Sequence, residues 1–198
     1  MTTHVPAGTP AETVDDVRAR EAARSPELAA QGYLRRLWRP VLQPGEWRTL
    51  GLFAADDAGQ LENVLASMPL RIWRTDEVTP LLPHPNDPKL EGITPNHGHQ
   101  TEFLIAMTIT VPAGTSPQVV DDTQAHEAER ARELAGQGHL VRLWALPGER
   151  DSRRTLGLWR ARDTQEMTAV LDSLPLHAWM TVETERLTAH PSDPPATR

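Results

Sequence analysis

The sequence contains no cysteine, which excludes disulfide bonds, thiolate nucleophiles and zinc sites built from cysteine. It has no apolar stretch long enough to span a membrane, and its N-terminus has neither the basic nor the apolar region of a signal peptide. We therefore expect a cytoplasmic protein that does not bind membranes.

Positive charge is also scarce, because the formal net charge is -7 and lysine and arginine form no long run. Nucleic acids and anionic membranes are bound through strongly basic surfaces, so neither is an expected partner. Hydrophobic residues make up 38% of the chain, which is enough to form a core. The composition thus predicts a globular protein.

The most informative feature is an internal repeat. Residues 5–9 recur as 111–115, residues 31–38 recur in large part as 137–144, and the His-Pro-x-Asp-Pro motif at 84–88 recurs at 190–194, so every match is displaced by 106 positions. We predict two homologous domains at residues 1–88 and 102–194, joined by a linker at 89–101 that is rich in proline, asparagine, glycine and histidine. Repeat 1 begins at Met1, the equivalent of Met107, so we expect either a shortened first strand or a sequence that starts late.

The second repeat shows the expected elements most clearly. Hydrophobic patterning and turn residues predict, in order, a strand at 103–111, a helix at 117–138, a hairpin of strands at 140–146 and 154–161, a helix from Asp163 to about Ser173, and a strand at 179–187. This β-α-β-β-α-β order is typical of a ferredoxin-like unit. The predicted fold class is α+β, with two tandem ferredoxin-like units packed as an intrachain pseudo-dimer of the dimeric α/β-barrel type.

A glutamate recurs in the first helix of each repeat. Heptad spacing places it in line with apolar residues, in the series Val14, Glu21, Leu28 and Val120, Glu127, Leu134. A carboxylate on the buried face of a helix is costly when ionised, and desolvation raises its pKa toward values useful for proton transfer. Glu21 and Glu127 are therefore candidate catalytic residues. The alternative is that each lies at the edge of the core and is paired with an arginine, such as Arg18 or Arg24.

An Arg-Leu-Trp sequence follows in each repeat, at Arg36 to Trp38 and at Arg142 to Trp144. Strand alternation places arginine and tryptophan on one face and leucine on the other. If the first face meets the helices, Arg36, Trp38, Arg142 and Trp144 line a pocket beside the glutamate. Otherwise the arginine is exposed and the tryptophan belongs to an interface.

Metal binding and phosphate binding have no sequence support. His84 and His190 each precede a proline and have no second histidine or carboxylate at a ligand spacing, so we interpret them as loop residues and predict no metal site. A glycine-rich phosphate loop and a nucleophile elbow are both absent.

Taken together, these residues resemble the muconolactone Δ-isomerase family. The resemblance covers nearly all of each repeat and rests on the opening strand at 103–111, the helix glutamate, Gly138 with the Arg142-Leu143-Trp144 strand, residues 174–176 and the closing residues 190–192. It implies a small enzyme of aromatic catabolism that uses no cofactor, with the helix glutamate shifting a proton between the carbons of a butenolide.

The resemblance also implies a set of substrate-binding residues. A family lysine maps to Arg18 in repeat 1 and to Gln124 in repeat 2, and the family arginine that follows the tryptophan is present as Arg39 but replaced by Ala145. Arg36 and Arg142 replace a family histidine. The expected substrate-binding residues are Arg18, Arg36, Trp38, Arg39, His84, Arg142, Trp144 and His190. Pro26 lies inside the first helix and is expected to kink it.

Three functions follow from this interpretation. The first is an isomerase that moves a proton and a double bond in a small unsaturated lactone or related enone. The second is a biosynthetic cyclase or isomerase with a bulkier, polyketide-like substrate bound between the repeats. The third is a non-catalytic binding protein in which Glu21 and Glu127 pair with arginines and have no cavity beside them. We expect a small-molecule ligand and a homo-oligomer.

Overall fold

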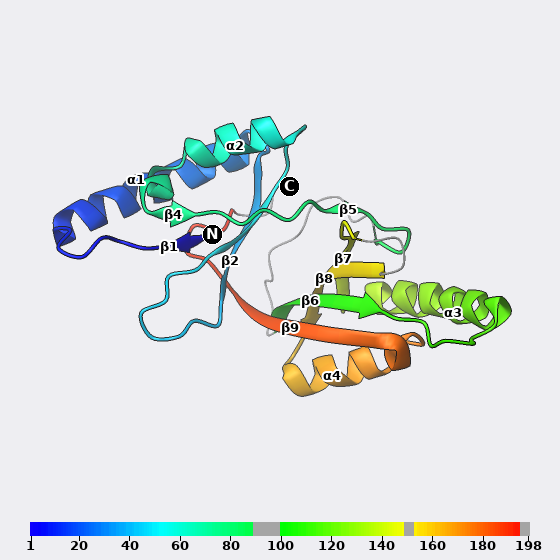
Figure 1. Ribbon diagram of the computed structural model, residues 1–198. Helices are drawn as coiled ribbons and strands as arrows, with labels where there is room; N and C mark the ends of the chain where they lie inside the picture. The colour runs from blue at the N-terminus through cyan, green and yellow to red at the C-terminus, as the bar shows by residue number, and fades with distance from the viewer. Residues whose placement is uncertain (89–99, 149–152, 195–198) are drawn as a thin grey trace. The chain divides into compact units, whose positions relative to one another are not determined.

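The computed structural model describes residues 1–88, 100–148 and 153–194 (Figure 1). These residues form two compact units: unit 1 contains residues 1–78 and 188–194, and unit 2 contains residues 79–88 and 100–187. Each unit therefore combines most of one repeat with the C-terminal end, or tail, of the other repeat. The tails are residues 188–194 in unit 1 and residues 79–88 in unit 2. The predicted linker at 89–101 lies almost entirely outside the described residues.

Unit 2 is an antiparallel sheet in the order β9-β6-β8-β7-β5. The strands are β6 (Thr101–Ile109), β7 (Leu140–Ala145), β8 (Arg153–Ala161) and β9 (Met180–Ala189), with the two-residue β5 (Leu82–Pro83) from the preceding repeat paired to β7. Two α-helices, α3 (Pro117–Gly136) and α4 (Thr164–Asp172), follow β6 and β8, and the short 3₁₀ helix η2 (His177–Trp179) precedes β9. This is the strand order of a ferredoxin-like unit with one added edge strand.

Both helices of unit 2 pack on the same face of the sheet. Side chains from α3 and α4 share one buried cluster with alternating residues of β6 and β8, namely Phe103, Ile105, Met107, Leu134, Trp159, Met167 and Leu171. The predicted cap of α4 is present, since the Asp163 carboxylate accepts a hydrogen bond from the Glu166 N–H at 2.8 Å. The prediction of a mixed fold with antiparallel sheets is confirmed.

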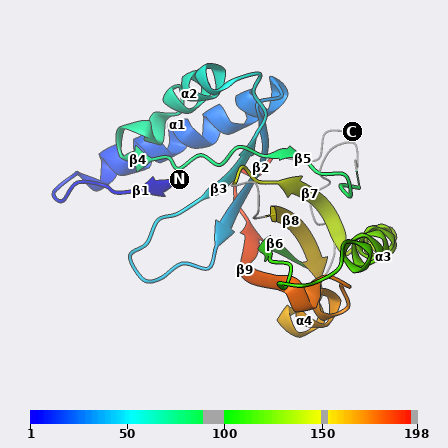
Figure 2. The same ribbon diagram turned by 45° about the vertical axis from the view of Figure 1, so that its right-hand side comes forward.

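Unit 1 has the same order of elements, and its strands other than β2 are shorter than their counterparts in unit 2. They are β1 (Thr2–Thr3), α1 (Ala11–Ala30), β2 (Leu34–Pro40), β3 (Leu50–Phe53), α2 (Ala58–Ala66), η1 (Pro69–Ile72) and β4 (Arg74–Thr75). β1 pairs with β4, β2 pairs with β3, and a single bridge joins Thr2 to Arg48 next to β3. Figures 1 and 2 show α1 and α2 lying side by side.

Helix α1 continues through Pro26 to Ala30, so the proline does not end it. The neighbouring Ser25 is buried, and its hydroxyl donates to the Glu21 carbonyl at 3.1 Å. The helix ends before Gly32, whose φ of +80° is the left-handed conformation that suits glycine after a helix. In the described part of the chain, no helix is long and apolar enough to cross a bilayer.

Two equivalent aspartate-arginine pairs hold the tails against strands β2 and β7. In unit 1, Asp193 accepts hydrogen bonds from the Arg36 side chain at 3.0 Å and from the Leu37 N–H at 2.7 Å. In unit 2, Asp87 accepts from the Arg142 side chain at 3.0 Å and from the Leu143 N–H at 3.0 Å. The two pairs differ in burial, because the Arg36 side chain is 1% exposed and that of Arg142 is 23% exposed.

We expect Asp193→Asn to lower the free energy of unfolding by about 3–5 kcal/mol, because it leaves the buried Arg36 guanidinium without its counter-charge while the amide oxygen can still accept from Leu37. Urea unfolding followed by circular dichroism measures this loss. The matched control is Asp87→Asn, whose arginine partner reaches solvent and whose loss should be smaller. Equal losses in the two variants would contradict the conclusion that the Arg36–Asp193 pair is the more deeply buried of the two.

Candidate active sites

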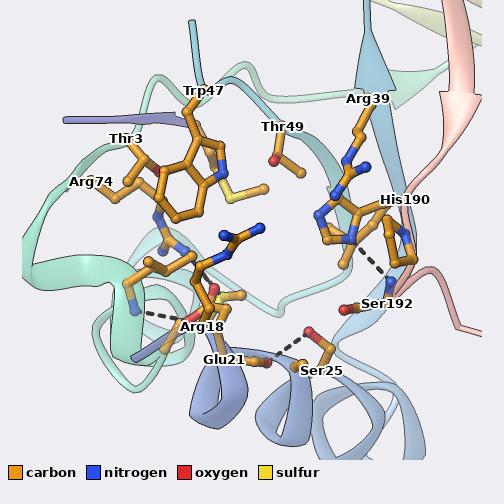
Figure 3. A pocket seen from close by; sticks show the side chains of 16 residues that line it. Thr3, Arg18, Glu21, Ser25, Arg39, Trp47, Thr49, Arg74, His190 and Ser192 are labelled. Carbon is orange, nitrogen blue, oxygen red and sulfur yellow. Dashed lines mark hydrogen bonds and ion pairs between the residues drawn. The ribbon is translucent and has the colours of Figure 1, made fainter. Parts of the chain in front are cut away.

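Cavity 1 lies in unit 1 and has a volume of about 220 Å³. Its titratable side chains come from four parts of the chain: Arg18 and Glu21 from α1, Arg39 from β2, Arg74 from β4, and His190 from the end of repeat 2. Figure 3 shows the side chains of Arg18, Arg39 and His190 directed toward the space between them, with Trp47 along another side. The cavity therefore places one carboxylate among several cationic and hydrogen-bonding groups.

Both carboxylate oxygens of Glu21 are held in place. Oε1 accepts from Nη1 of Arg74 at 3.1 Å, and Oε2 accepts from the Leu70 N–H at 2.8 Å. Burial raises the pKa of Glu21, while the Leu70 N–H and the Arg74 charge oppose that rise. Arg74 is itself buried and is shared with Asp76, whose Oδ1 lies 2.6 Å from Nε of Arg74. Glu21 is thus an oriented carboxylate with an elevated pKa.

Two guanidinium groups of cavity 1 remain available to a ligand. The Arg18 guanidinium lies over the Trp47 ring, 5.2 Å from its centroid. Neither Arg18 nor Arg39 forms an ion pair with a carboxylate in the part of the chain that the structure describes. They can therefore stabilise negative charge on a bound compound.

His190 contributes a neutral imidazole to cavity 1. Its Nδ1 accepts a hydrogen bond from the Ser192 N–H at 3.1 Å, which leaves the ring proton on Nε2. Burial, together with the nearby charge of Arg39, lowers the pKa of His190 to about 4. At neutral pH this residue is therefore an uncharged hydrogen-bond donor.

Cavity 2 lies in unit 2 and has the same volume, about 220 Å³. Glu127 from α3 and His84 from the end of repeat 1 occupy the places equivalent to Glu21 and His190. Oε2 of Glu127 accepts from the Leu176 N–H at 3.0 Å, and burial raises the pKa of Glu127. No arginine contacts it within the described residues, because Met180 stands at the position equivalent to Arg74.

The structure does not bring Arg36, Trp38, Arg142 and Trp144 into either cavity. As predicted, each arginine lies on the same strand face as its tryptophan, with the guanidinium of Arg36 4.7 Å from the Trp38 ring centroid and that of Arg142 5.1 Å from the Trp144 ring centroid. However, it is the opposite face, carrying Leu37 and Leu143, that meets the helices and lines the cavities. Arg36 is also buried and paired with Asp193, so the expectation of an exposed arginine is wrong for repeat 1.

The sequence did not predict that the tail of each repeat joins the unit of the other repeat, nor did it predict several residues that line the cavities. Repeat boundaries grouped His84 with Glu21 and His190 with Glu127, whereas each histidine lines the cavity of the other glutamate. Trp47, Arg74, Arg153 and Trp159 were also missed. Aligning the repeats at the offset of 106 could have identified two of these positions, because Arg74 aligns with Met180 and Trp47 aligns with Arg153.

In the ranges described, no group of three or more histidine, aspartate or glutamate side chains is arranged to hold a metal ion.

Comparison with known proteins identifies one family in both repeats. The sequence model described as "Muconolactone delta-isomerase" matches residues 1–87 and 101–193. "Muconolactone Delta-isomerase 1" of Acinetobacter lwoffii is 34% identical over 86 residues, which are 43% of this chain and 86% of that protein. "Muconolactone Delta-isomerase" of Cupriavidus pinatubonensis is 33% identical over 86 residues, 43% of this chain and 90% of that protein.

Two solved structures are also similar. A crystal structure of muconolactone isomerase covers 46% of this chain and 92% of its own, with 26% identity and a TM-score of 0.41. A structure described as a novel heme-binding protein from Thermus thermophilus covers 93% of this chain and 85% of its own, with 12% identity and a TM-score of 0.59, so the likeness concerns the fold alone. Because the family matches nearly the whole of both repeats, the chain belongs to the muconolactone Δ-isomerase family and is an isomerase.

Proposed function

We propose that the protein is a cofactor-independent isomerase that moves a proton, and with it a double bond, in a small unsaturated lactone or related enone. Catalysis takes place in cavity 1, with Glu21 as the acid and base. The observation that carries this proposal is the joint placement, in one cavity, of a partly buried carboxylate with a raised pKa and two guanidinium groups that have no carboxylate partner among the described residues.

The chemistry needs only a proton carrier. The ionised Glu21 carboxylate takes a proton from a carbon made acidic by conjugation with the carbonyl, and the electron pair of the broken C–H bond enters the dienolate. The same carboxyl group then returns the proton to a different carbon, so the reaction changes neither composition nor oxidation state. Each oxygen of Glu21 has one protein hydrogen bond and keeps acceptor capacity for the incoming proton.

Stabilisation of the dienolate is assigned to the groups that face Glu21. Negative charge develops on the carbonyl oxygen as the proton leaves, and preorganised donors aimed at that oxygen lower the energy of that state. Arg18 and Arg39 supply positive charge, and Nε2 of the neutral His190 supplies a hydrogen bond. We assign Arg36, Trp38, Arg142 and Trp144 to fastening the tails and stabilising the strands rather than to substrate binding.

The size of the cavity favours a small substrate. Drug-sized ligands usually occupy pockets of roughly 300–1,000 Å³. At about 220 Å³, cavity 1 suits a five- or six-membered ring better than a polyketide-like compound. The non-catalytic alternative requires each glutamate to be paired with an arginine and to have no cavity beside it, and both Glu21 and Glu127 line cavities.

Several expectations from the sequence remain predictions. These are the domain boundaries at 1–88 and 102–194, the packing of the repeats as a pseudo-dimer, the homo-oligomer and the cytoplasmic location.

We predict that Glu21→Gln lowers isomerisation about 10²–10⁴-fold, because an amide of the same shape cannot carry the proton. The measurement is proton exchange by NMR in deuterated water with a panel of butenolides and enones. Glu127→Gln is the matched control and should retain activity toward a substrate turned over in cavity 1. Full activity in Glu21→Gln with complete loss in Glu127→Gln would move catalysis to cavity 2.

The pH profile provides an independent test. Glu21 must be ionised to act as a base, and burial raises its pKa above the ordinary value of 4.5, so kcat/KM should rise with pH through a pKa above 4.5. Arg74 lowers the pKa of Glu21, so Arg74→Met should move this acidic limb to higher pH. Circular dichroism checks that the variant is folded. An unmoved limb would mean that another group controls activity.

His190→Asn should reduce kcat about 10- to 100-fold through loss of one hydrogen bond to a charged intermediate. Because the pKa of His190 is about 4, the residue is already neutral in the working range, so the acidic limb above that pH should keep its position. Steady-state kinetics in a Glu127→Gln background reports cavity 1 alone. His84→Asn, in cavity 2, is the matched control, and an equal effect there would contradict the crossing of the tails.

A further inference from the structure

The two cavities have the same volume but differ in charge. Three positions that carry arginine around cavity 1, at Arg18, Arg39 and Arg74, are occupied in repeat 2 by Gln124, Ala145 and Met180. The glutamate and the tail histidine are kept, as Glu127 and His84. Repeat 2 has therefore retained a cavity while losing the charges that would balance an anion beside the glutamate.

The polar groups facing cavity 2 are mostly neutral. They include the Gln124 amide, the Thr155 hydroxyl and the His84 imidazole, whose Nδ1 accepts from the Asn86 N–H at 3.1 Å and so leaves the proton on Nε2. Arg153 also lines the cavity and is exposed to solvent, as Arg18 and Arg39 are at cavity 1, so cavity 2 has one arginine where cavity 1 has three. Apolar side chains, among them Met107, Leu143 and Met180, form the rest of the wall.

Trp159 adds a hydrogen-bond donor that has no partner. It is 2% exposed, and its Nε1 makes no hydrogen bond within the described structure. Nε1 lies over Gly157, where a Cβ would overlap it, and the next residue on that strand face is Thr155, which lines cavity 2. Trp159 itself lines cavity 2, so its indole N–H is a buried, unpaired donor in the wall of that cavity. Repeat 1 carries Phe53 at the equivalent position, and the indole that lines cavity 1, that of Trp47, is only partly buried.

We propose that cavity 2 is a second binding site that takes an uncharged carbonyl compound, with the Trp159 N–H as one of its donors, whereas a compound carrying a carboxylate binds in cavity 1. The lactone or enone class of this ligand rests on the proposed function. The selection against carboxylates and the role of Trp159 rest on the lining of cavity 2 alone.

The physical reason is the cost of burying charge. A carboxylate placed beside Glu127 loses its hydration and finds no guanidinium among the groups that contact that glutamate. A carbonyl oxygen needs only hydrogen bonds, and an unpaired buried N–H such as that of Trp159 gains most from receiving an acceptor. The elevated pKa of Glu127 fits the same environment, since burial disfavours negative charge there.

The test uses one butenolide as a free carboxylate and as its methyl ester, titrated into the full chain with methyl-¹³C methionine. The methionines report the two cavities separately: Met1 and Met68 line cavity 1, Met107 and Met180 line cavity 2, and the buried Met167 lines neither. We expect the ester to shift Met107 and Met180, and the carboxylate to shift Met1 and Met68 only.

Two variants sharpen the result. Trp159→Phe introduces the residue that repeat 1 carries and should weaken ester binding at cavity 2 about 5- to 50-fold, with the response of Met1 and Met68 unchanged. Met180→Arg introduces the residue equivalent to Arg74 and should make the carboxylate shift Met107.

Each contrary outcome has a distinct meaning. If the carboxylate binds cavity 2 as tightly as the ester, or if Met1 and Met68 respond to a compound while Met107 and Met180 respond to neither, the second site is overturned and the proposed isomerase stands. Unchanged ester binding in Trp159→Phe overturns the donor role. If no cavity methionine responds to either compound, the lactone class itself is wrong, and the proposed function fails with it.

Discussion

In each repeat, one carboxylate on the first helix lies largely out of solvent, and both candidate active sites depend on this constraint. A buried carboxylate is tolerated only when its oxygens receive hydrogen bonds or when it binds a proton. Both repeats supply a backbone N–H, from Leu70 and from Leu176, one residue after a proline. Among the described residues, an arginine contacts the glutamate in repeat 1 and none does in repeat 2, so similar helices hold glutamates in different electrostatic surroundings.

Each tail adds a histidine to the cavity that contains the glutamate of the other repeat. The aspartate three residues after that histidine binds an arginine and a backbone N–H of the first hairpin strand, which sets the position of the tail. This arrangement explains why an Arg-Leu-Trp strand lies beside the site without placing its arginine in the cavity.

Local sequence signals predicted most of the fold, because helices and hairpins depend on near neighbours. Hydrophobic patterning located both ends of α3 and of β9 to within two residues. The predicted Asp163 cap is present, and heptad spacing placed Glu21 and Glu127 beside the core. Long-range contacts were not predictable in this way. Strand alternation puts Arg36 and Leu37 on opposite faces but does not say which face meets the helices, and nothing near His190 indicates that it joins the unit containing Glu21.

The central claim is that Glu21 and Glu127 are partly buried carboxyl groups whose desolvation favours the protonated form. Titration of ¹³C-carboxyl-labelled glutamate by NMR, with Glu21→Gln and Glu127→Gln to assign the signals, tests it most directly. We predict that both groups titrate above the ordinary value of 4.5, and that the Glu21 signal shifts when a lactone enters cavity 1. Titration of both groups at or below the ordinary value would contradict the account.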